Sequence, residues 1–299
     1  PEVDYEKTTA SGEEFAKVFY DISGRTDVQF GDLVSLSVFR PNIRMVNKFG
    51  EGRVFIVGDA AHTHSPTGGQ GMNSSVLDAA NVSWKIALVS KGLAPHSLLQ
   101  TYSDERVPVI REMLGRTTRL LDRTMRPGED RDEGWFRGGP LFMLGINYRW
   151  SPLAVDERRD PPTADERESA YVGAEGVCAG DRAPDAPVAG DVAQLFDLFK
   201  ITRHVVLVFS ADGAVTNAVV AAVGKLPHGS VEVATVLPES ATVSSTQSAR
   251  FVKDKDGLAY KAYEITSDPT IVVVRPDGFV GAVVKGVEGV NNYFKRVFV

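Results

Sequence analysis

Cysteine and long apolar runs are what this sequence has least of. Cys178 is the only cysteine among the 299 residues, so no disulfide can form within the chain, which fits a reducing, cytoplasmic compartment. No run of about 18 apolar residues occurs, so we expect no membrane-spanning helix. The net charge of -6 disfavours nucleic acid and anionic membrane surfaces as partners.

Two further absences limit the chemistry. A chain with one cysteine has no Cys-x-x-Cys motif and therefore no dithiol redox site. The sequence also has no Gly-x-Gly-x-x-Gly fingerprint, the loop that holds the phosphates of a dinucleotide. What remains is an ordinary globular composition, 43% hydrophobic and 24% charged, in a chain long enough for two domains.

The most informative stretch begins at Arg53 and continues to about Ser90. A short apolar run, Val54–Val57, ends in Gly58-Asp59, passes through a Gly/Pro-rich loop and enters a helical pattern. We expect Val54–Val57 to be a central parallel strand that is buried on both faces. The loop then lies at the carboxyl end of a strand and the amino end of a helix, where ligands and negative charge are favoured.

The residues of this loop suit a cofactor. The Asp59 carboxylate can accept hydrogen bonds from a ribityl or ribose hydroxyl, and the glycines of 68–71 let the backbone approach a flat ring. The amides of Gly71, Met72 and Asn73 would stabilise charge on the pyrimidine side of a reduced flavin. The residues alone indicate an anion or cofactor loop. The alternatives are a turn or cap role for Asp59 and a tight turn for the glycines.

His62 and His64 raise the question of a metal. Two histidines at this spacing, with no cysteine or carboxylate cluster nearby, make a poor metal site. We therefore expect no metal and assign both side chains to packing or to hydrogen bonds within the loop.

Helix and strand patterns flank the stretch. Ser11 to Glu14 has the form of a capping box, and it opens a helix that ends near Ser23-Gly24. Residues 32–46 alternate apolar and polar side chains, which predicts a strand exposed on one face and interrupted at Pro41. The helix after the loop should end near Lys91-Gly92. Its apolar, largely buried positions are Val76, Leu77, Ala80, Trp84, Ile86, Ala87 and Leu88.

A second capping box, Ser97 to Gln100, predicts another helix, which runs towards Arg123 and kinks at Pro108. Residues 126–139 are typical of a loop, and 156–168 of a linker or a long surface connection. A small α/β domain follows. Its expected elements are strands at 204–209, 231–236 and 270–274, helices at 215–223 and from about 290, a short element at 259–265, a turn at 275–278 and an apolar segment at 279–284.

The stretch around the loop also resembles a known family. Residues 53–62 read RVFIVGDAAH and residues 65–73 read SPTGGQGMN. Together they closely resemble the second flavin motif of the single-component FAD-dependent aromatic hydroxylases, the group of p-hydroxybenzoate and phenol hydroxylases. The similarity continues through Asp78, Asn81, Trp84-Lys85 and residues 102–106, which read YSDER.

The resemblance implies roles for residues of the loop. The position of Asp59 binds the ribityl chain in that family, and the loop from Pro66 to Asn73 lines the isoalloxazine ring. Pro66 would face the ring near the aromatic substrate. The implied cofactor-binding residues are Asp59, Pro66, Gly69, Gln70, Gly71, Met72 and Asn73. No catalytic residue is assigned.

The carboxyl part resembles the thioredoxin-like tail domain of the phenol hydroxylase branch. The features that carry this similarity are 180–184, the two strands at 204–209 and 270–274, and the turn 275–278, which reads RPDG. Without a Cys-x-x-Cys motif, redox chemistry is not expected there. We expect a role in packing or in subunit association, such as a homodimer.

The implied fold is α/β, with α+β character in part: the carboxyl portion of a Rossmann-like, FAD-binding aromatic hydroxylase fold, followed by a thioredoxin-like domain. The expected divisions are 1–50, the end of a substrate-binding sheet; 51–135, the FAD-binding portion; 136–178, a linker; and 179–299, the thioredoxin-like domain. The family's Gly-x-Gly-x-x-Gly segment, its middle Asp-Gly motif and most of its substrate sheet would precede Pro1.

The implied activity is that of an FAD- and NAD(P)H-dependent monooxygenase. It would use dioxygen to hydroxylate a phenolic ring through a flavin hydroperoxide. Two alternatives stay open. One is a flavin monooxygenase that hydroxylates a polyketide-like ring or oxidises it by Baeyer–Villiger chemistry. The other is a non-catalytic, truncated relative that serves as an association module.

Overall fold

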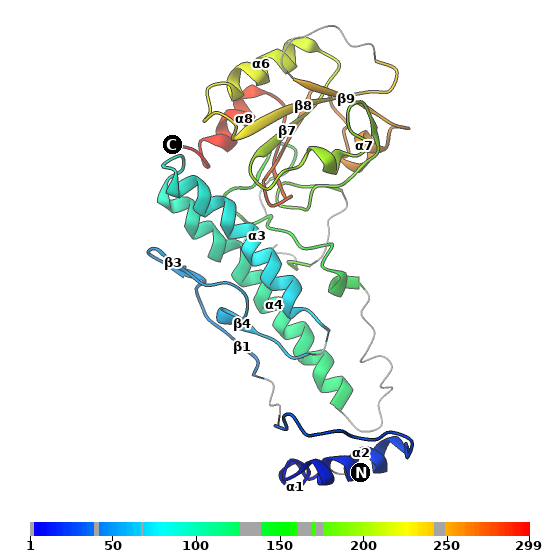
Figure 1. Cartoon of the computed structure of the whole chain (residues 1–299). Helices are drawn as coiled ribbons and strands as arrows, with labels where there is room; N and C mark the ends of the chain where they lie inside the picture. Colours follow the sequence, from blue (N-terminus) through cyan, green and yellow to red (C-terminus); the bar gives the residue numbers. More distant parts are fainter. Residues whose placement is uncertain are drawn as a thin grey trace. The chain divides into compact units, whose positions relative to one another are not determined.

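The computed structural model describes residues 3–38, 42–66, 68–125, 139–160, 169–171, 176–241 and 249–299. The chain forms two compact units, Pro1–Asn42 and Ile43–Val299, and each is considered by itself. Figure 1 shows the elements in chain order from α1 to α8. Within the described residues, none of the helices is both long and apolar enough to cross a membrane.

The first unit contains two helices, α1 (Tyr5–Thr8) and α2 (Gly12–Ser23). The α2 helix begins at the predicted cap, because the Ser11 hydroxyl accepts a hydrogen bond from the Glu14 amide at 3.2 Å. The second half of the predicted capping box is replaced by an ion pair, in which the Glu14 carboxylate accepts from Lys17 at 2.6 Å. The helix ends at Gly24, whose φ of 64° gives the left-handed cap that favours glycine.

The strand predicted over 32–46 is wrong for its first half. Residues 32–38 form no strand, residues 39–41 lie outside the described residues, and only Arg44–Met45 pairs, as β1 of the second unit. Just before this segment, Phe30 packs onto α2 and contacts the rings of Phe15, Phe19 and Tyr20 edge to face. An alternating pattern makes a strand only where a neighbouring strand is available to pair with it.

The second unit begins with two small antiparallel sheets. In one, β1 pairs with β4 (His62–Thr63); in the other, β2 (Gly50–Glu51) pairs with β3 (Val54–Phe55). The prediction of a buried central parallel strand at Val54–Val57 is therefore wrong. Gly52, with a φ of 59°, turns the chain back on itself to form a hairpin, and Val54 is 69% exposed.

Two long helices follow, α3 (Gly71–Ser90) and α4 (Gln100–Met125), which lie side by side in Figure 1. As predicted, α3 ends beside Lys91-Gly92 and α4 contains Pro108. The Ser97 capping box is wrong, because Pro95 starts a 3-10 turn, η2 (His96–Leu99), ahead of α4. The predicted loop 126–139 lies outside the described residues up to 138, and residue 139 begins another 3-10 turn, η3 (Gly139–Phe142).

The buried face of α3 also differs from the prediction. Val76 and Ile86, which the sequence placed in the core, are 60% and 40% exposed. The fully covered positions are mostly polar: Ser74, Asp78, Asn81, Val82, Trp84 and Lys85. Asp78, Asn81 and Lys85 are covered because they find partners on α4, and Asn81 also on the carboxyl domain.

A seven-stranded sheet forms the carboxyl domain, in the order β5-β11-β10-β7-β8-β9-β6. The β7, β8 and β9 strands are parallel to one another, while β10 is antiparallel to both β7 and β11. The strands are β5 (Val155–Asp156), β6 (Val188–Ala189), β7 (His204–Phe209), β8 (Val231–Leu237), β9 (Arg250–Asp254), β10 (Thr270–Val274) and β11 (Val280–Val284).

Helices cover both faces of this sheet. The helices α6 (Gly213–Val223) and α8 (Val287–Phe294) pack with alternate residues of β7 and β10 in one apolar cluster. The helix α7 (Leu258–Ala262) and the turn η4 (Leu195–Leu198) pack on the opposite face in a second cluster. The apolar strands and helices predicted here are confirmed, because a strand covered on both faces is apolar throughout.

Part of the segment 136–178 is built into this domain. The strand β5 extends the sheet by pairing in parallel with β11. Residues 161–168, the rest of the predicted surface connection, lie outside the described residues.

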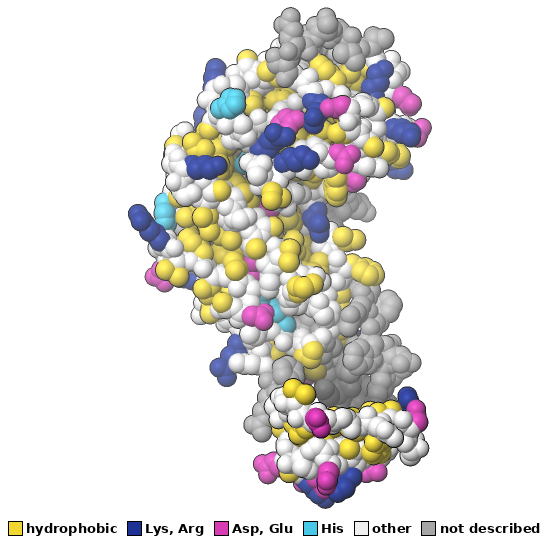
Figure 2. Space-filling view, in the orientation of Figure 1, with side chains coloured by type: hydrophobic (Ala, Val, Ile, Leu, Met, Phe, Trp, Pro, Cys, Tyr) yellow, Lys and Arg dark blue, Asp and Glu magenta, His cyan; other side chains and the backbone are white. Residues whose placement is uncertain are grey.

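On the face drawn in Figure 2, charged side chains are frequent over the carboxyl sheet and sparse over the middle of the chain, where α3 and α4 lie in Figure 1. Several charged residues of these two helices are instead fully covered: Asp78, Lys85, Glu105 and Arg106. A buried charge needs an opposite charge and hydrogen bonds, so the fold depends on how these four are paired.

Candidate functional site

The predicted site residues lie in two places: Asp59 lies in a turn before β4, and the others lie in the loop between β4 and α3 and in the first turn of α3. Asp59 lies in the 3-10 turn η1 (Gly58–Ala60), which packs against α3, and its side chain is exposed. Gly58 has a φ of 59°, and a Cβ there would lie 2.7 Å from the Ser75 hydroxyl. Only glycine fits this conformation and this approach, so Gly58 sets the position of Asp59 next to α3.

The first turn of α3 offers unpaired amides. The first backbone bond of the helix runs from the Ser74 amide to the Gln70 carbonyl at 3.0 Å. The amides of Gly71, Met72 and Asn73 precede it and have no partner within the helix. Met72 and Asn73 are exposed, so this positive helix end faces outward and can receive an anionic or electron-rich group.

The remaining predicted residues differ in exposure. Pro66 and Gly69 are exposed, and Gly69 has a φ of 63°. Gln70 is buried, and its side-chain amide donates to the carbonyls of Gly68 at 2.8 Å and Leu141 at 3.0 Å. The buried side chain of Gln70 therefore fixes the loop from its inner side, while Pro66 and Gly69 are exposed on its outer side.

Four buried polar atoms around this loop have no hydrogen-bond partner among the described residues: His64 Nδ1, Ser65 Oγ, Gln70 Oε1 and Ser74 Oγ. Most buried polar atoms in folded proteins are paired. The polar lining therefore fits a bound molecule that carries several hydrogen-bonding groups, such as a flavin.

A buried polar network lies beneath the loop. The Asp78 carboxylate pairs with His62 Nε2 at 2.6 Å and with Arg106 Nε at 2.7 Å. It also accepts the Gly58 amide at 3.2 Å, so it anchors the turn that carries Asp59. Burial alone would raise the pKa of Asp78, but the hydrogen bond from His62 and the charge of Arg106 outweigh it and lower that pKa.

The two histidines bond to each other, with His62 Nδ1 and His64 Nε2 2.6 Å apart. Burial, together with the neighbouring His62, lowers the pKa of His64 to about 4. No group of three His, Cys, Asp or Glu side chains suited to a metal ion occurs in the part of the chain that the structure describes.

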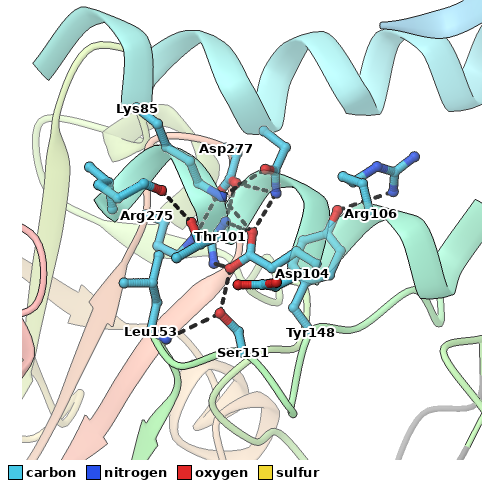
Figure 3. Close-up of polar contacts among 12 residues, drawn as sticks. Lys85, Thr101, Asp104, Arg106, Tyr148, Ser151, Leu153, Arg275 and Asp277 are labelled. Atoms are coloured by element: carbon cyan, nitrogen blue, oxygen red, sulfur yellow. Dashed lines mark hydrogen bonds and ion pairs between the residues drawn. The ribbon is translucent and has the colours of Figure 1, made fainter. Parts of the chain in front are cut away.

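A second network joins the helices to the carboxyl domain. Glu105 on α4 accepts hydrogen bonds from Asn81 at 2.6 Å and Lys85 at 2.8 Å, both on α3. It also forms a bidentate pair with Arg275, at 2.7 and 2.9 Å, and accepts from the Ser151 hydroxyl at 2.6 Å. Figure 3 shows Lys85, Arg275 and Ser151 converging on this point from three segments of the chain.

Charges balance within this second network. Arg275 also pairs with Asp277, which accepts a hydrogen bond from the Trp84 indole at 3.3 Å. Burial would raise the pKa of Glu105, but the charges of Arg275 and Lys85 outweigh it and hold that pKa far below its usual range. Burial lowers the pKa of Lys85 to about 8, with Glu105 opposing the shift.

Tyr148 connects the two networks. Its hydroxyl accepts a hydrogen bond from Arg106 at 3.2 Å, and its ring lies 5.5 Å from the Arg275 guanidinium and packs in a tilted arrangement against Phe279, with centroids 4.3 Å apart. Contacts between side chains therefore run without a break from Asp78 and His62 near the start of α3 to the turn between β10 and β11.

Reading the sequence for apolar periodicity missed these networks. A usable signal was present: Ser74, Asp78, Asn81 and Lys85 follow one another at spacings of four, three and four residues, which places them on one helix face. The family resemblance quoted three of them but assigned them no role.

Comparison with known proteins agrees with the predicted resemblance. Residues 2–117 match the FAD binding domain family, and residues 199–299 match the phenol hydroxylase C-terminal dimerisation domain. The chain is therefore similar to the FAD-dependent aromatic hydroxylases in both segments. A flavin-dependent monooxygenase of Mycobacteroides abscessus is 36% identical over 284 residues, which cover 94% of this chain and 48% of that protein. Pentachlorophenol 4-monooxygenase of Sphingobium chlorophenolicum is 39% identical over 191 residues, which cover 61% and 32%.

Solved structures show the same fold. Aklavinone-11 hydroxylase, in a ternary complex with FAD and aklavinone, superposes with a TM-score of 0.76 at 23% identity over 98% of this chain and 52% of that one. The monooxygenase PieE, in complex with FAD and substrate, gives 0.73 at 23% identity over 99% and 56%. The chain thus spans about half the length of the proteins it resembles.

The second network yields a prediction about stability. Replacing Arg275 with methionine leaves Glu105 buried with one cationic partner fewer, so Arg275→Met should lower the free energy of unfolding by about 3–5 kcal/mol. Arg111 is exposed on the same helix as Glu105, and Arg111→Met should change it by less than about 0.5 kcal/mol. Urea denaturation measures the free energy of unfolding of both variants. If the two substitutions lower it equally, the ion pair between Glu105 and Arg275 contributes little to stability.

The first network yields a prediction about pH. Since the folded pKa of His64 lies below the ordinary value, the unfolded chain binds a proton that the folded chain rejects between about pH 6.5 and 4. The stabilisation that neutral His64 gives the folded chain is therefore fully present above about pH 6.5 and is lost as the pH falls towards 4. The unfolding free energies of wild type and His64→Gln should therefore converge as the pH drops from 7 to 4. A constant difference would contradict a neutral His64.

Proposed function

We propose that this chain provides the flavin-ring end of an FAD site in an aromatic monooxygenase. Asp59 would bind the ribityl hydroxyls, while Pro66 and the backbone of 69–73 would lie against the isoalloxazine ring. The observation that carries this proposal is the outward-facing first turn of α3, whose amides have no helical partner. Positive charge at a helix end stabilises negative charge on the pyrimidine side of the ring.

A bound FAD would supply the oxidation chemistry, with NAD(P)H as the reductant and dioxygen as the source of the oxygen atom that the aromatic ring receives; the second oxygen atom would leave as water. The residues of this chain orient the cofactor and fix the electrostatics around it. None of them is assigned as a catalytic acid or base.

We propose a phenolic substrate, with a polyketide-like ring as the alternative. The relative named pentachlorophenol 4-monooxygenase supports the first class, and the fold shared with the aklavinone complex leaves the second open. Analysis of products from both classes of ring, made by a protein that contains this chain, would distinguish them.

The assignment of Asp59 predicts a selective loss of flavin binding. Asp59→Ala should weaken binding of riboflavin and FAD about tenfold or more, because a charge-assisted hydrogen bond is lost. Lumiflavin has no ribityl chain, so its affinity should stay the same. Quenching of flavin fluorescence measures all three affinities, and Asp122→Ala, at an exposed position of α4, is the control.

Two results would count against this reading. Equal losses for lumiflavin and riboflavin would show that Asp59 acts on the loop rather than on the ribityl chain. If the wild-type chain binds none of the three flavins, the alternative of a non-catalytic association module is favoured.

We further propose that the carboxyl domain mediates self-association. The match of 199–299 to a dimerisation domain supports this second role. At micromolar concentration, light scattering should give the chain the mass of a homodimer, about twice 32.4 kDa. A mass of 32.4 kDa at every micromolar concentration measured would contradict the proposal.

A further inference from the structure

The histidine pair beneath the loop ends in a nitrogen without a partner. Asp78, His62 and His64 form a chain of short contacts, with 2.6 Å from Asp78 Oδ2 to His62 Nε2 and 2.6 Å from His62 Nδ1 to His64 Nε2. The far nitrogen, His64 Nδ1, is buried and has no hydrogen-bond partner among the described residues. Which nitrogens carry protons decides what His64 can bind.

The proton on His62 is fixed by Asp78. A carboxylate has no hydrogen to donate, and Asp78 already accepts from Arg106 Nε and from the Gly58 amide. The short contact between Asp78 and His62 therefore needs the hydrogen on His62 Nε2.

Charge balance then fixes the proton on His64. Asp78 and Arg106 are both fully buried and neutralise each other, so a second cation on His62 would leave an unpaired buried charge. A neutral His62 with its hydrogen on Nε2 accepts at Nδ1, and the contact at 2.6 Å requires that His64 Nε2 donates. A neutral His64 is left with a lone pair on Nδ1.

The ring that carries this lone pair lies beside the start of α3. A Cβ built on Gly71, the first residue of that helix, would lie 3.8 Å from His64 Cδ2. Ser65 Oγ, next in the sequence, and Gln70 Oε1, in the same loop, are also buried without partners. The His64 ring, with its unpaired Nδ1, therefore belongs to the same loop as these two atoms and lies next to the first residue of α3.

We propose that His64 Nδ1 accepts a hydrogen bond from an N–H or O–H group of the molecule bound at the start of α3. The donor is the imide N–H of the flavin ring or the hydroxyl of a phenolic substrate. Asp78 and His62 are positioning residues that keep the acceptor nitrogen free of a proton. The inference rests on the proposed flavin site and adds a side chain that selects for donor groups.

The protonation pattern can be tested without any ligand. Nitrogen-15 NMR of the histidine side chains in the unliganded chain at pH 7 should show His64 protonated at Nε2 and bare at Nδ1. A proton on Nδ1 would overturn the proposal whether or not flavin binds.

Ligand binding tests the acceptor directly. His64→Phe keeps a ring and removes both nitrogens, so it should weaken binding of lumiflavin, or of phenol in the presence of lumiflavin, about tenfold. His64→Gln restores an acceptor oxygen and should recover part of the loss. His96, exposed in η2, provides the control His96→Phe, and thermal unfolding checks that each variant is folded.

Methylated probes identify the donor. If the flavin imide donates, 3-methyllumiflavin should bind wild type and His64→Phe equally, while lumiflavin prefers wild type. If the substrate donates, anisole should show no preference, while phenol prefers wild type. If His64→Phe is folded and binds all four probes as tightly as the wild type does, the inference is overturned, while the proposed flavin site is not. No binding of any probe to the wild type would overturn both.

Discussion

The second unit depends on one buried carboxylate. Glu105 has no exposed surface, and it accepts hydrogen bonds from α3, from the segment after Tyr148 and from the turn between β10 and β11. Without the positive charges of Lys85 and Arg275, burying the Glu105 carboxylate would cost more free energy than the fold can supply. The charge of Glu105 therefore makes the association of helices and sheet a condition of folding, where apolar packing alone would tolerate many arrangements.

Arg106, the residue after Glu105 on α4, belongs to the first network instead. Arg106 pairs with Asp78, which holds the Gly58 turn and the histidine pair beneath the cofactor loop. Two consecutive positions on α4 thus support two regions: Glu105 supports the contact with the carboxyl domain, and Arg106 supports the floor of the proposed flavin site. Tyr148 contacts both. The turn that carries Asp59 is accordingly held by the buried ion pair of Asp78 and Arg106, and packed, hydrogen-bonded supporting residues favour precise placement of a flat cofactor.

The sequence predicted what is local. The cap at Ser11, the extent of α3 and the strands at 204–209 and 270–274 follow from short-range patterns, and the structure confirms them. Val54–Val57 was misread because its hairpin partner, not its own composition, decides whether it is central. The polar face of α3 was missed because its charge balance requires Arg275, which lies 170 residues beyond Glu105. The roles of the loop residues came from family resemblance and stay proposals.

The pairing of Glu105 with Arg275 also limits how such proteins can be recombined. In many multidomain enzymes a tail can be exchanged at a linker with little effect on the remainder. In this protein, a grafted carboxyl domain without an arginine at the turn between β10 and β11 would leave the Glu105 carboxylate on α4 buried without that partner. Chimeras should therefore carry α3, α4 and the β10–β11 turn together as one exchangeable block.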